Sequence, residues 1–475
     1  EQVLGLKESH AWDRVETQCC KTAAQIWSSD LTFRQKVNSF NAKIIPALGY
    51  IIGSTIKGGG KYKSVLESGE ELDKKFRKLL VELKVRYKAS CVDRLYLATE
   101  QGGYGVKSVK DSLEEATIYS WAYLCTTKAL QRSLSLFVAM DNRDKRSVIS
   151  DARNILERYE ITADLDPTTS TVTIEGTRFN DAKDLARLVV GKIRLINTNN
   201  RRTSWEAKEL AGRVLRSVDR IDLRASFSWL QEGKLSSTAV RNVTAAQEGC
   251  LITKAHPSQN SLGNRSCRGC GKAIETIEHV VAACSKWLPN LYIDRHDSVA
   301  RCLHYRICDK YGLATHHYSQ RVDSVKENDR IKLYWNQPVQ TKSIIRHNKP
   351  DIVIFDKAER TATIVEIAVS WFTGMERQME LKRNRYCVNG NYGEELDLPY
   401  PRGENLLREL QTEGWETSFL PVVIGTSGEV LMGLSDQIQK YLKISKEKAE
   451  DSIERMARSA VLGTSRIIKN HLARS

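Results

Sequence analysis

Apolar residues recur at steps of three and four along the first part of the chain. One run contains Cys19 and Ala23, and a second contains Leu72 and Phe76. Because an α-helix turns once every 3.6 residues, this spacing gathers the apolar side chains of each run on one face. The pattern predicts two amphipathic helices with these residues in a core. The full runs are Trp12, Val15, Cys19, Ala23 and Ile26, and Leu72, Phe76, Leu79 and Leu83.

The chain between about residues 130 and 250 has mostly helical patterning. A β-rich run, Thr171–Ile174, follows the turn at Asp166-Pro167 and predicts one strand of a hairpin. Basic clusters in this part are either solvated faces or phosphate contacts. The same alternatives apply to the basic glycine-rich loop Lys57–Lys63. The clusters are Arg143, Lys145 and Arg146, and Arg201 and Arg202.

A strand pattern returns near residue 350. Two β-rich runs, Asp351–Asp356 and Thr361–Val369, flank a polar loop of four residues. The antiparallel register across this loop places Asp351 opposite Glu366, with opposing Cβ atoms about 5 Å apart. Both strand faces are otherwise apolar, so the hairpin should be buried, and two buried like charges are costly unless a cation or a shared proton compensates. The pattern predicts a divalent metal site, and carboxylate oxygens suit Mg²⁺.

The alternative for the two acids is structural. Either carboxylate can cap a strand end at the surface, or a slip of register can turn one of them away. The helix-like segment that follows has Met375, Met379, Lys382 and Tyr386 at steps of four, three and four, which place them on one face. Lys382 therefore either points toward the acids or is an ordinary solvated lysine.

Four potential metal ligands occur in the order C-x2-C-x8-H-x4-C. They are Cys267, Cys270, His279 and Cys284. Thiolate and imidazole at these spacings can form a tetrahedral zinc site, and four protein ligands make such a site structural. The alternatives are buried cysteines that lie near a histidine, or a ligand set that draws on nearby residues. Those residues are Cys302, His304 and Cys308.

Composition narrows the class of protein. A length of 475 residues predicts three or four domains, and no apolar run is long enough to cross a membrane. The net charge of +15 favours a polyanionic partner. Eleven cysteines, with no signal-peptide pattern, favour a reducing compartment such as the nucleus or cytoplasm. Because the first residue is Glu1 and not Met, we expect further sequence upstream.

Several motifs, in this order, resemble non-LTR retrotransposons of the restriction-like-endonuclease class, which include elements that insert into ribosomal RNA genes. Lys349-Pro350-Asp351, with fourteen residues before Glu366, is similar to the nuclease motif (K/R)-P-D-x12-14-(D/E) of this family. The CCHC ligands and Arg295-His296-Asp297 resemble its knuckle region. The other similar segments are Val3-Leu4-Gly5 and Arg94-Leu95-Tyr96 with Gly102-Gly103 for the reverse-transcriptase thumb, and Ser228-Trp229-Leu230 and Ala245-Ala246-Gln247 for the linker.

The resemblance implies a nuclear protein that nicks target DNA for target-primed reverse transcription. Asp351 and Glu366 would be catalytic acids that bind Mg²⁺, with Lys382 as the lysine that orients the attacking water and Tyr386 in support. Ala368 stands where the broader PD-(D/E)xK pattern has its lysine. The implied partners are target DNA, element RNA and the RNA–DNA hybrid, with no membrane. The Asp-Asp pair of a polymerase palm is absent from the sequence, so we expect no reverse-transcriptase activity from this chain alone.

The expected fold is a multidomain α+β chain in five regions. Two alternatives to the nuclease are a catalytically inactive, nucleic-acid-binding remnant of such an element, and a host resolvase or repair nuclease that shares the fold. The regions are a helical thumb at 1–130, a mostly helical linker at 131–250, a CCHC zinc knuckle at 251–310, an α/β restriction-endonuclease-like domain with a central mixed sheet at 311–432, and a helical tail at 433–475.

Overall fold

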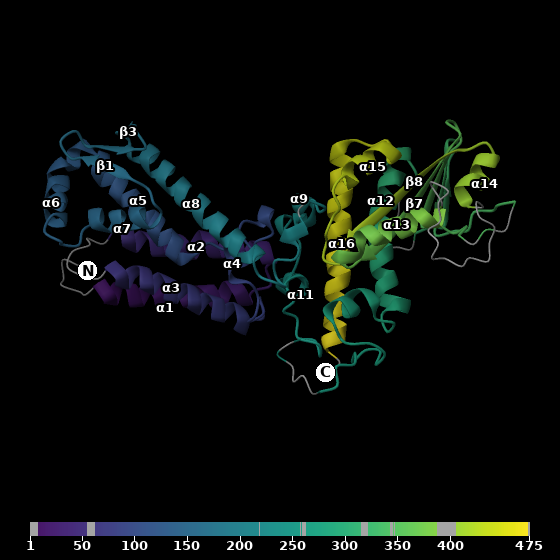
Figure 1. Cartoon of the computed structure of the whole chain (residues 1–475), viewed down its shortest axis with the longest axis horizontal. Coiled ribbons are helices and arrows are strands. Elements are labelled where there is room, and N and C mark those ends of the chain that lie inside the picture. The colour runs from purple at the N-terminus through teal and green to yellow at the C-terminus, as the bar shows by residue number, and fades with distance from the viewer. Residues whose placement is uncertain are drawn as a thin grey trace. The chain divides into compact units, whose positions relative to one another are not determined.

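The structure, a computed structural model, divides into two compact units (Figure 1). Unit 1 contains residues 1–99 and 103–209, and unit 2 contains residues 100–102 and 210–475. The predicted combination of helices with a mixed sheet is confirmed, whereas the finer division into five regions stays a prediction. The residues that the structure describes are 8–54, 62–217, 219–256, 258, 263–314, 322–342, 345, 347–386 and 405–473.

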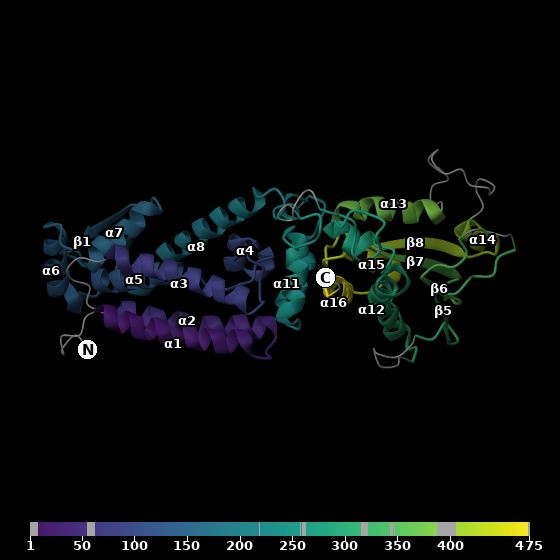
Figure 2. The same ribbon diagram turned by 90° about the horizontal axis from the view of Figure 1, so that it is seen from below.

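Unit 1 consists of helices packed along one another with a small sheet (Figure 2). The helix α5 lies against α2, α3, α7 and α8, and α1 packs on α2. The helices are α1 (Glu8–Ser28), α2 (Phe33–Ser54), α3 (Tyr62–Glu82), α4 (Val92–Tyr96), α5 (Val109–Thr126), α6 (Gln131–Asp141), α7 (Val148–Arg158) and α8 (Ala182–Glu206), with short 3-10 turns at Thr99–Gln101 and Lys128–Leu130.

The two helices predicted from apolar spacing are α1 and α3. Cys19 and Ala23 are buried on α1, and Leu72 and Phe76 are buried on α3, as predicted. The buried faces then continue at Trp27 and Leu80. The other predicted core residues are only partly buried, namely Trp12, Val15, Ile26, Leu79 and Leu83. A helical turn takes 3.6 residues, so a step of four residues stays closer to the same face of the helix than a step of three. The core residue that follows Ala23 or Phe76 is therefore one position later than predicted.

The predicted strand at Thr171–Ile174 is β2, the central strand of a three-stranded antiparallel sheet. Its neighbours are β1 (Ala163–Asp166) and β3 (Thr177–Phe179). Val172 and Ile174 are buried against α5, α7 and α8 in one apolar cluster. Two segments singled out in the sequence, Val3-Leu4-Gly5 and residues 57–61 of the basic loop, lie outside the described residues.

A five-stranded sheet with the order β4-β5-β6-β7-β8 forms the centre of unit 2. The first four strands are antiparallel, and β8 pairs with β7 in parallel, so the sheet is mixed. The predicted register of the β6–β7 hairpin is confirmed, because Asp356 pairs with Thr361 and Val353 with Ile364. The strands are β4 (Val325–Glu327), β5 (Ile331–Trp335), β6 (Ile352–Asp356), β7 (Thr361–Ser370) and β8 (Glu416–Gly425).

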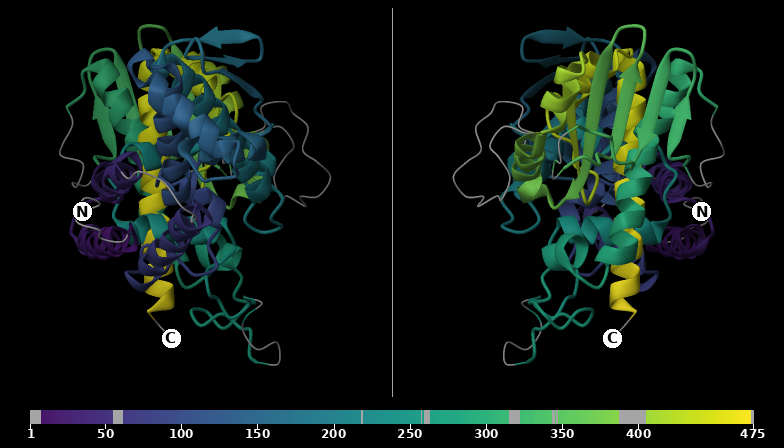
Figure 3. Two further views of the ribbon diagram at one scale, coloured as in Figure 1. Left: turned by 90° about the vertical axis from the view of Figure 1, so that its left-hand side faces the viewer. Right: turned by 90° about the vertical axis from the view of Figure 1, so that its right-hand side faces the viewer.

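Helices cover both faces of this sheet, which explains why every residue of β6 is buried and the first four are apolar (Figures 2 and 3). Alternate side chains point to opposite faces of a strand. Ile352 and Ile354 therefore join a core with α12, α15 and α16, while Val353 and Phe355 join a second core with Tyr386 of α13 and residues of α14.

The first of these cores includes residues of three of the predicted regions, since α12, the sheet and the C-terminal helices contribute to it. No helix in the described part of the chain is long and apolar enough to cross a membrane. The helices of unit 2 are α9 (Leu223–Ser226), α10 (Ser228–Gln231), α11 (Ser237–Gln247), α12 (Ile293–Tyr311), α13 (Met375–Tyr386), α14 (Leu406–Thr412), α15 (Leu434–Leu442) and α16 (Lys446–Leu472), with shorter turns at Leu215–Ser217, His279–Ala283, Leu288–Tyr292 and Phe372–Gly374.

Candidate metal centre and carboxylate site

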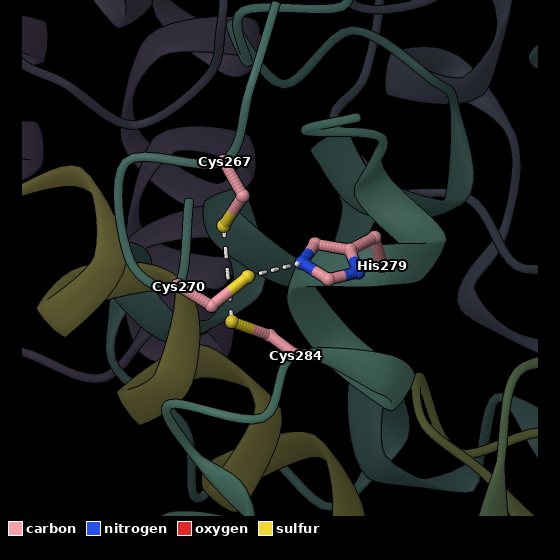
Figure 4. A group of neighbouring side chains, drawn as sticks. All are labelled: Cys267, Cys270, His279 and Cys284. Atoms are coloured by element: carbon pink, nitrogen blue, oxygen red, sulfur yellow. Dashed lines mark hydrogen bonds between the residues drawn. The ribbon is translucent and has the colours of Figure 1, made fainter. Parts of the chain in front are cut away.

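The four predicted zinc ligands lie together in unit 2 (Figure 4). Sγ of Cys267 is 3.7 Å from Sγ of Cys284, and Sγ of Cys270 is 3.3 Å from Nε2 of His279. All four ligand atoms lie within 4.8 Å of one another. This Cys₃His cluster could therefore hold a metal ion such as zinc, with each residue giving one ligand atom.

Local backbone structure brings the first two cysteines together. The amide N–H of Gly271 donates to the carbonyl of Cys267, and the amide of Cys267 donates to the carbonyl of Ala273, each at 2.7 Å. Gly271 has a positive φ of 66°, which a residue without Cβ adopts easily. The other two ligands, His279 and Cys284, stand at the two ends of one helical turn. The spacing in the sequence therefore predicted both halves of the cluster correctly.

The thiols differ in their electrostatic environment. Burial acts to raise the pKa of Cys270, but backbone and side-chain hydrogen bonds to its sulfur outweigh burial and lower the pKa to about 6. Burial raises the pKa of Cys284 to about 12. Metal ligation requires thiolates, so Cys270 is already suited to it, whereas Cys284 needs the charge of a metal ion to lose its proton.

A buried polar group joins the metal cluster to the end of α16. Glu275 is fully buried and accepts hydrogen bonds from Arg268, at 2.7 Å from its amide and 3.0 Å from its side chain. These contacts hold the pKa of Glu275 near 2, although burial alone would raise it. His471, in the last turn of α16, has Nε2 only 3.2 Å from Glu275. Glu275 and His471 also lie within ligand distance of Cys267, and no spacing in the sequence predicted this contact.

The alternative ligands considered from the sequence lie elsewhere. Cys302, His304 and Cys308 are on α12, and among the described residues they take part in no metal-binding cluster. Sγ of Cys302 is 3.4 Å from the hydroxyl of Ser459, and His304 stacks edge-on against Trp335. These side chains are part of the packing between helices and sheet.

Asp351 and Glu366 lie side by side at one end of the β6–β7 hairpin. Asp351 directly precedes β6, and its amide donates to Glu366 Oε1 at 3.2 Å. The amide of Ile367 donates in turn to Asp351 Oδ2 at 2.7 Å. Glu366 is buried and Asp351 is partly exposed. Neither the surface-cap alternative nor the register slip applies to this arrangement.

The helix α13 brings a lysine and a tyrosine to the same carboxylates. Nζ of Lys382 donates to Glu366 Oε2 and lies 3.7 Å from Asp351 Oδ2. The hydroxyl of Tyr386 donates to Glu366 Oε1 at 2.8 Å, and burial raises the pKa of Tyr386, so the phenol stays protonated. Lys382 is largely buried and points toward the acids, as one of the two alternatives predicted.

His296, near the start of α12, completes the site from the other face of the sheet. Its Nε2 is 3.4 Å from Asp351 Oδ2 and 3.1 Å from the carbonyl oxygen of Ile367, while Nδ1 is 3.0 Å from Asp297. Burial alone would lower the pKa of His296, but the carboxylates of Asp297 and Asp351 raise it to about 10. The imidazole is therefore a cation at neutral pH.

The position of His296 was not predicted from the sequence. Arg295-His296-Asp297 stood out only as a segment similar to a family, and no pattern linked it to residues more than fifty positions later. His296 and Lys382 are two side-chain cations beside the acid pair, so they supply part of the compensating charge that the sequence predicted, and the Mg²⁺ site stays a prediction. Together they hold the pKa of Asp351 below its usual range despite burial.

Two arginines of the basic clusters in unit 1 form ion pairs. Arg146 pairs with the buried Asp151 at 3.2 Å, and Arg201 pairs with Asp111 at 2.7 Å. The Arg201–Asp111 pair joins α8 to α5, whereas Arg146 lies just before α7 and pairs with a residue of that helix, so both arginines have an acidic partner within the fold.

Loss of the metal cluster should destabilise unit 2. In Cys270→Ser we expect loss of the bound zinc and a free energy of unfolding lower by about 4 kcal/mol when free zinc is present at a thousand times its Kd. Zinc analysis of the purified chain and thermal unfolding measure the two effects. Cys302→Ser is the control, because it changes a cysteine of the same unit outside the cluster. Equal zinc content in both variants would contradict the assignment.

Comparison with known proteins assigns the chain to no family. No protein-family model matches the chain, and no curated protein matches it significantly. The functional interpretation of the two sites therefore depends on their geometry and on the chemistry of their residues.

Proposed function

We propose that this chain hydrolyses phosphodiester bonds of DNA with Mg²⁺, acting as the nicking endonuclease of a retrotransposon protein. The observation that supports the proposal is the meeting of Asp351, Glu366 and Lys382 at one end of a buried hairpin. Two acids and one lysine in this arrangement can bind a hard divalent cation and orient a water molecule beside it. The match of Lys349-Pro350-Asp351 and Glu366 to the nuclease motif in spacing supports the same proposal.

The residues present fit Mg²⁺. The oxygens of Asp351 and Glu366 are hard ligands, and the carbonyl oxygen of Ile367 lies beside them, as its contact with the same nitrogen of His296 shows. These three residues would hold the ion, with water completing its coordination. Bound there, Mg²⁺ supplies a Lewis acid that lowers the pKa of water and offsets negative charge on the phosphodiester.

Three side chains next to the acid pair would assist the reaction. Lys382 holds the attacking water or a phosphate oxygen through a charge-assisted hydrogen bond. Tyr386, kept protonated by burial, donates to Glu366 and fixes the direction of its carboxylate. His296 is a positioning residue, because it keeps Asp351 ionised and oriented toward the hairpin.

The proposal also includes the metal cluster, the net charge, the partners and the compartment. The metal cluster would hold zinc and position the chain on nucleic acid, and the +15 charge suits binding to DNA and to RNA. Target DNA, element RNA and an RNA–DNA hybrid would be the partners, and the nucleus would be the compartment.

A second candidate is a nucleic-acid-binding remnant that does not cut. One observation favours it: Lys382 and His296 already neutralise the acid pair, as they would in a purely structural ion-pair network. The two candidates differ in their behaviour with metal. The remnant would bind nucleic acid in a salt-sensitive manner that depends on Cys270, and would leave DNA intact with every divalent cation.

The acid pair is tested with a nicking assay on supercoiled DNA. We expect Asp351→Asn and Glu366→Gln each to lower the Mg²⁺-dependent nicking rate by at least about 100-fold, because the ion loses a charged ligand. Glu380→Gln is the matched control, since Glu380 is exposed on α13 and should be neutral. Full activity in Asp351→Asn would exclude this site as the nuclease centre.

The role of His296 is tested through the pH profile of nicking at a sub-saturating Mg²⁺ concentration. The imidazolium helps to depress the pKa of Asp351, so in His296→Gln that pKa should rise. Protons then compete with Mg²⁺ for Asp351 at higher pH, and the activity lost on acidification should be lost at a higher pH than in the native chain.

His256→Gln is the control for this experiment, because His256 is bonded to Ser258 in the described part of the chain and lies outside the acid site. If His296 had a merely structural role, His296→Gln would lower activity at every pH, and the pH at which activity is lost on acidification would stay unchanged.

A further inference from the structure

Unit 2 contains a groove that neither the metal cluster nor the acid pair uses. It has a volume of about 770 Å³ and runs between the start of α11, the first half of α12 and the part of α16 from Arg455 to Lys469. These helices are neighbours in the structure (Figure 1). The groove is lined by six cationic side chains and one carboxylate, that of Asp294. The cationic side chains are Arg295, Arg301, Arg455, Arg458, Arg466 and Lys469.

Four of these cations have no carboxylate partner in the part of the chain that the structure describes. Arg301 donates to the carbonyl of Asp297 and to the hydroxyl of Ser298, both uncharged groups. Arg466 and Lys469 are exposed on the last turns of α16. By contrast, Arg458 pairs with Glu232, and Arg455 pairs with Asp451 at 3.0 Å. The groove therefore has a strong excess of positive charge.

Arg295 adds a buried charge to this excess. Its side chain is 3% exposed, and its Nη1 donates to the carbonyl of Val281 and to the hydroxyl of Thr464. Its Nε has no hydrogen-bond partner among the described residues. A Cβ at Gly463 would lie 2.5 Å from Cγ of Arg295, so only glycine at that position lets Arg295 lie against α16. A buried cation without a countercharge strengthens the field in the groove.

The remaining lining residues suit phosphate groups. Ser298 and Ser459 contribute hydroxyls to the lining, and Thr238 belongs to the first turn of α11, where the helix dipole attracts anions. Along α16 the lining residues recur at steps of three and four and so form one stripe. From Arg455 to Lys469 this stripe is about 21 Å long at 1.5 Å per residue.

We infer that this groove binds the phosphodiester backbone of DNA. A row of cations about 21 Å long fits an extended polyanion better than a single phosphate, since one strand of a duplex has a phosphate every 3.4 Å or so. Arginines, which make up five of the six cations, match phosphate geometry with two parallel donors. Arg295 faces the groove while the next residue, His296, contacts the acid pair, so the groove and the proposed nuclease site share the first turns of α12.

The choice of DNA as the ligand depends on the proposed function, whereas the groove itself is tested by binding alone. The variant Arg466→Gln/Lys469→Gln removes two groove charges from exposed positions. Lys446→Gln/Lys448→Gln is the matched control, because it removes the same charge from exposed positions in the first turn of the same helix. Equal unfolding temperatures establish that both variants fold.

Binding of the full-length variants to labelled single-stranded and double-stranded DNA is measured by fluorescence anisotropy over a range of salt, without Mg²⁺ and without chelator. In the groove variant we expect the Kd to rise about tenfold. The slope of log K against log salt should fall by about 1.8 for duplex and about 1.4 for a single strand, as two phosphate contacts predict. The control should keep the native slope.

A loss confined to one form of DNA supports the groove and identifies that form as its ligand. Equal weakening in both variants, or no weakening in the groove variant, would overturn the inference, because binding would then depend on total charge or on another surface. Since no cleavage is measured, the groove can fail while Asp351→Asn still abolishes nicking, and the reverse outcome is equally distinguishable.

Discussion

The arrangement of unit 2 depends on two carboxylates that lie side by side at the end of a buried hairpin. Two like charges in such a place are unfavourable unless cations compensate, and the effect grows as water is excluded. Lys382 of α13 approaches the pair from one face of the sheet and His296 of α12 from the other. The positions of both helices are thus coupled to the acid pair, because each helix supplies a cation that offsets the charge of the carboxylates. The same carboxylates are the proposed ligands of a metal ion.

The start of α12 connects the metal cluster to this site over a few residues. The amide of Cys284 donates to the hydroxyl of Tyr292 at 3.0 Å, and that hydroxyl donates to the carbonyl of Val280 at 2.9 Å. Arg295 then bonds the carbonyl of Val281, and His296 reaches Asp351. The CCHC cluster is therefore packed into the same unit as the sheet. Its metal would hold the start of α12 in place, and so would bear on the orientation of His296.

Charge is distributed unevenly over the molecule. In unit 1, Arg201 of α8 pairs with Asp111 of α5, and Arg146 pairs with Asp151 of α7, the helix that it precedes. In unit 2, several cations around the groove lack such partners among the residues that the structure describes, and Arg295 is buried there. Net charge alone favours a polyanionic partner, whereas the pairing of individual cations indicates which surface is available for it. At the acid pair, too, the partners of each charged side chain indicate whether its charge stabilises the fold or is available to a ligand.

The sequence by itself determined the features that depend on short-range geometry. The period of a helix located α1 and α3, the alternation of a strand set Asp351 opposite Glu366, and ligand spacing identified the CCHC cluster. The helical step from Met375 even brought Lys382 and Tyr386 to the correct face. Only the tertiary structure decided that His296 and His471 join these sites and that three helices form a basic groove. Contacts between distant segments depend on how elements pack, and no local period or spacing encodes that packing.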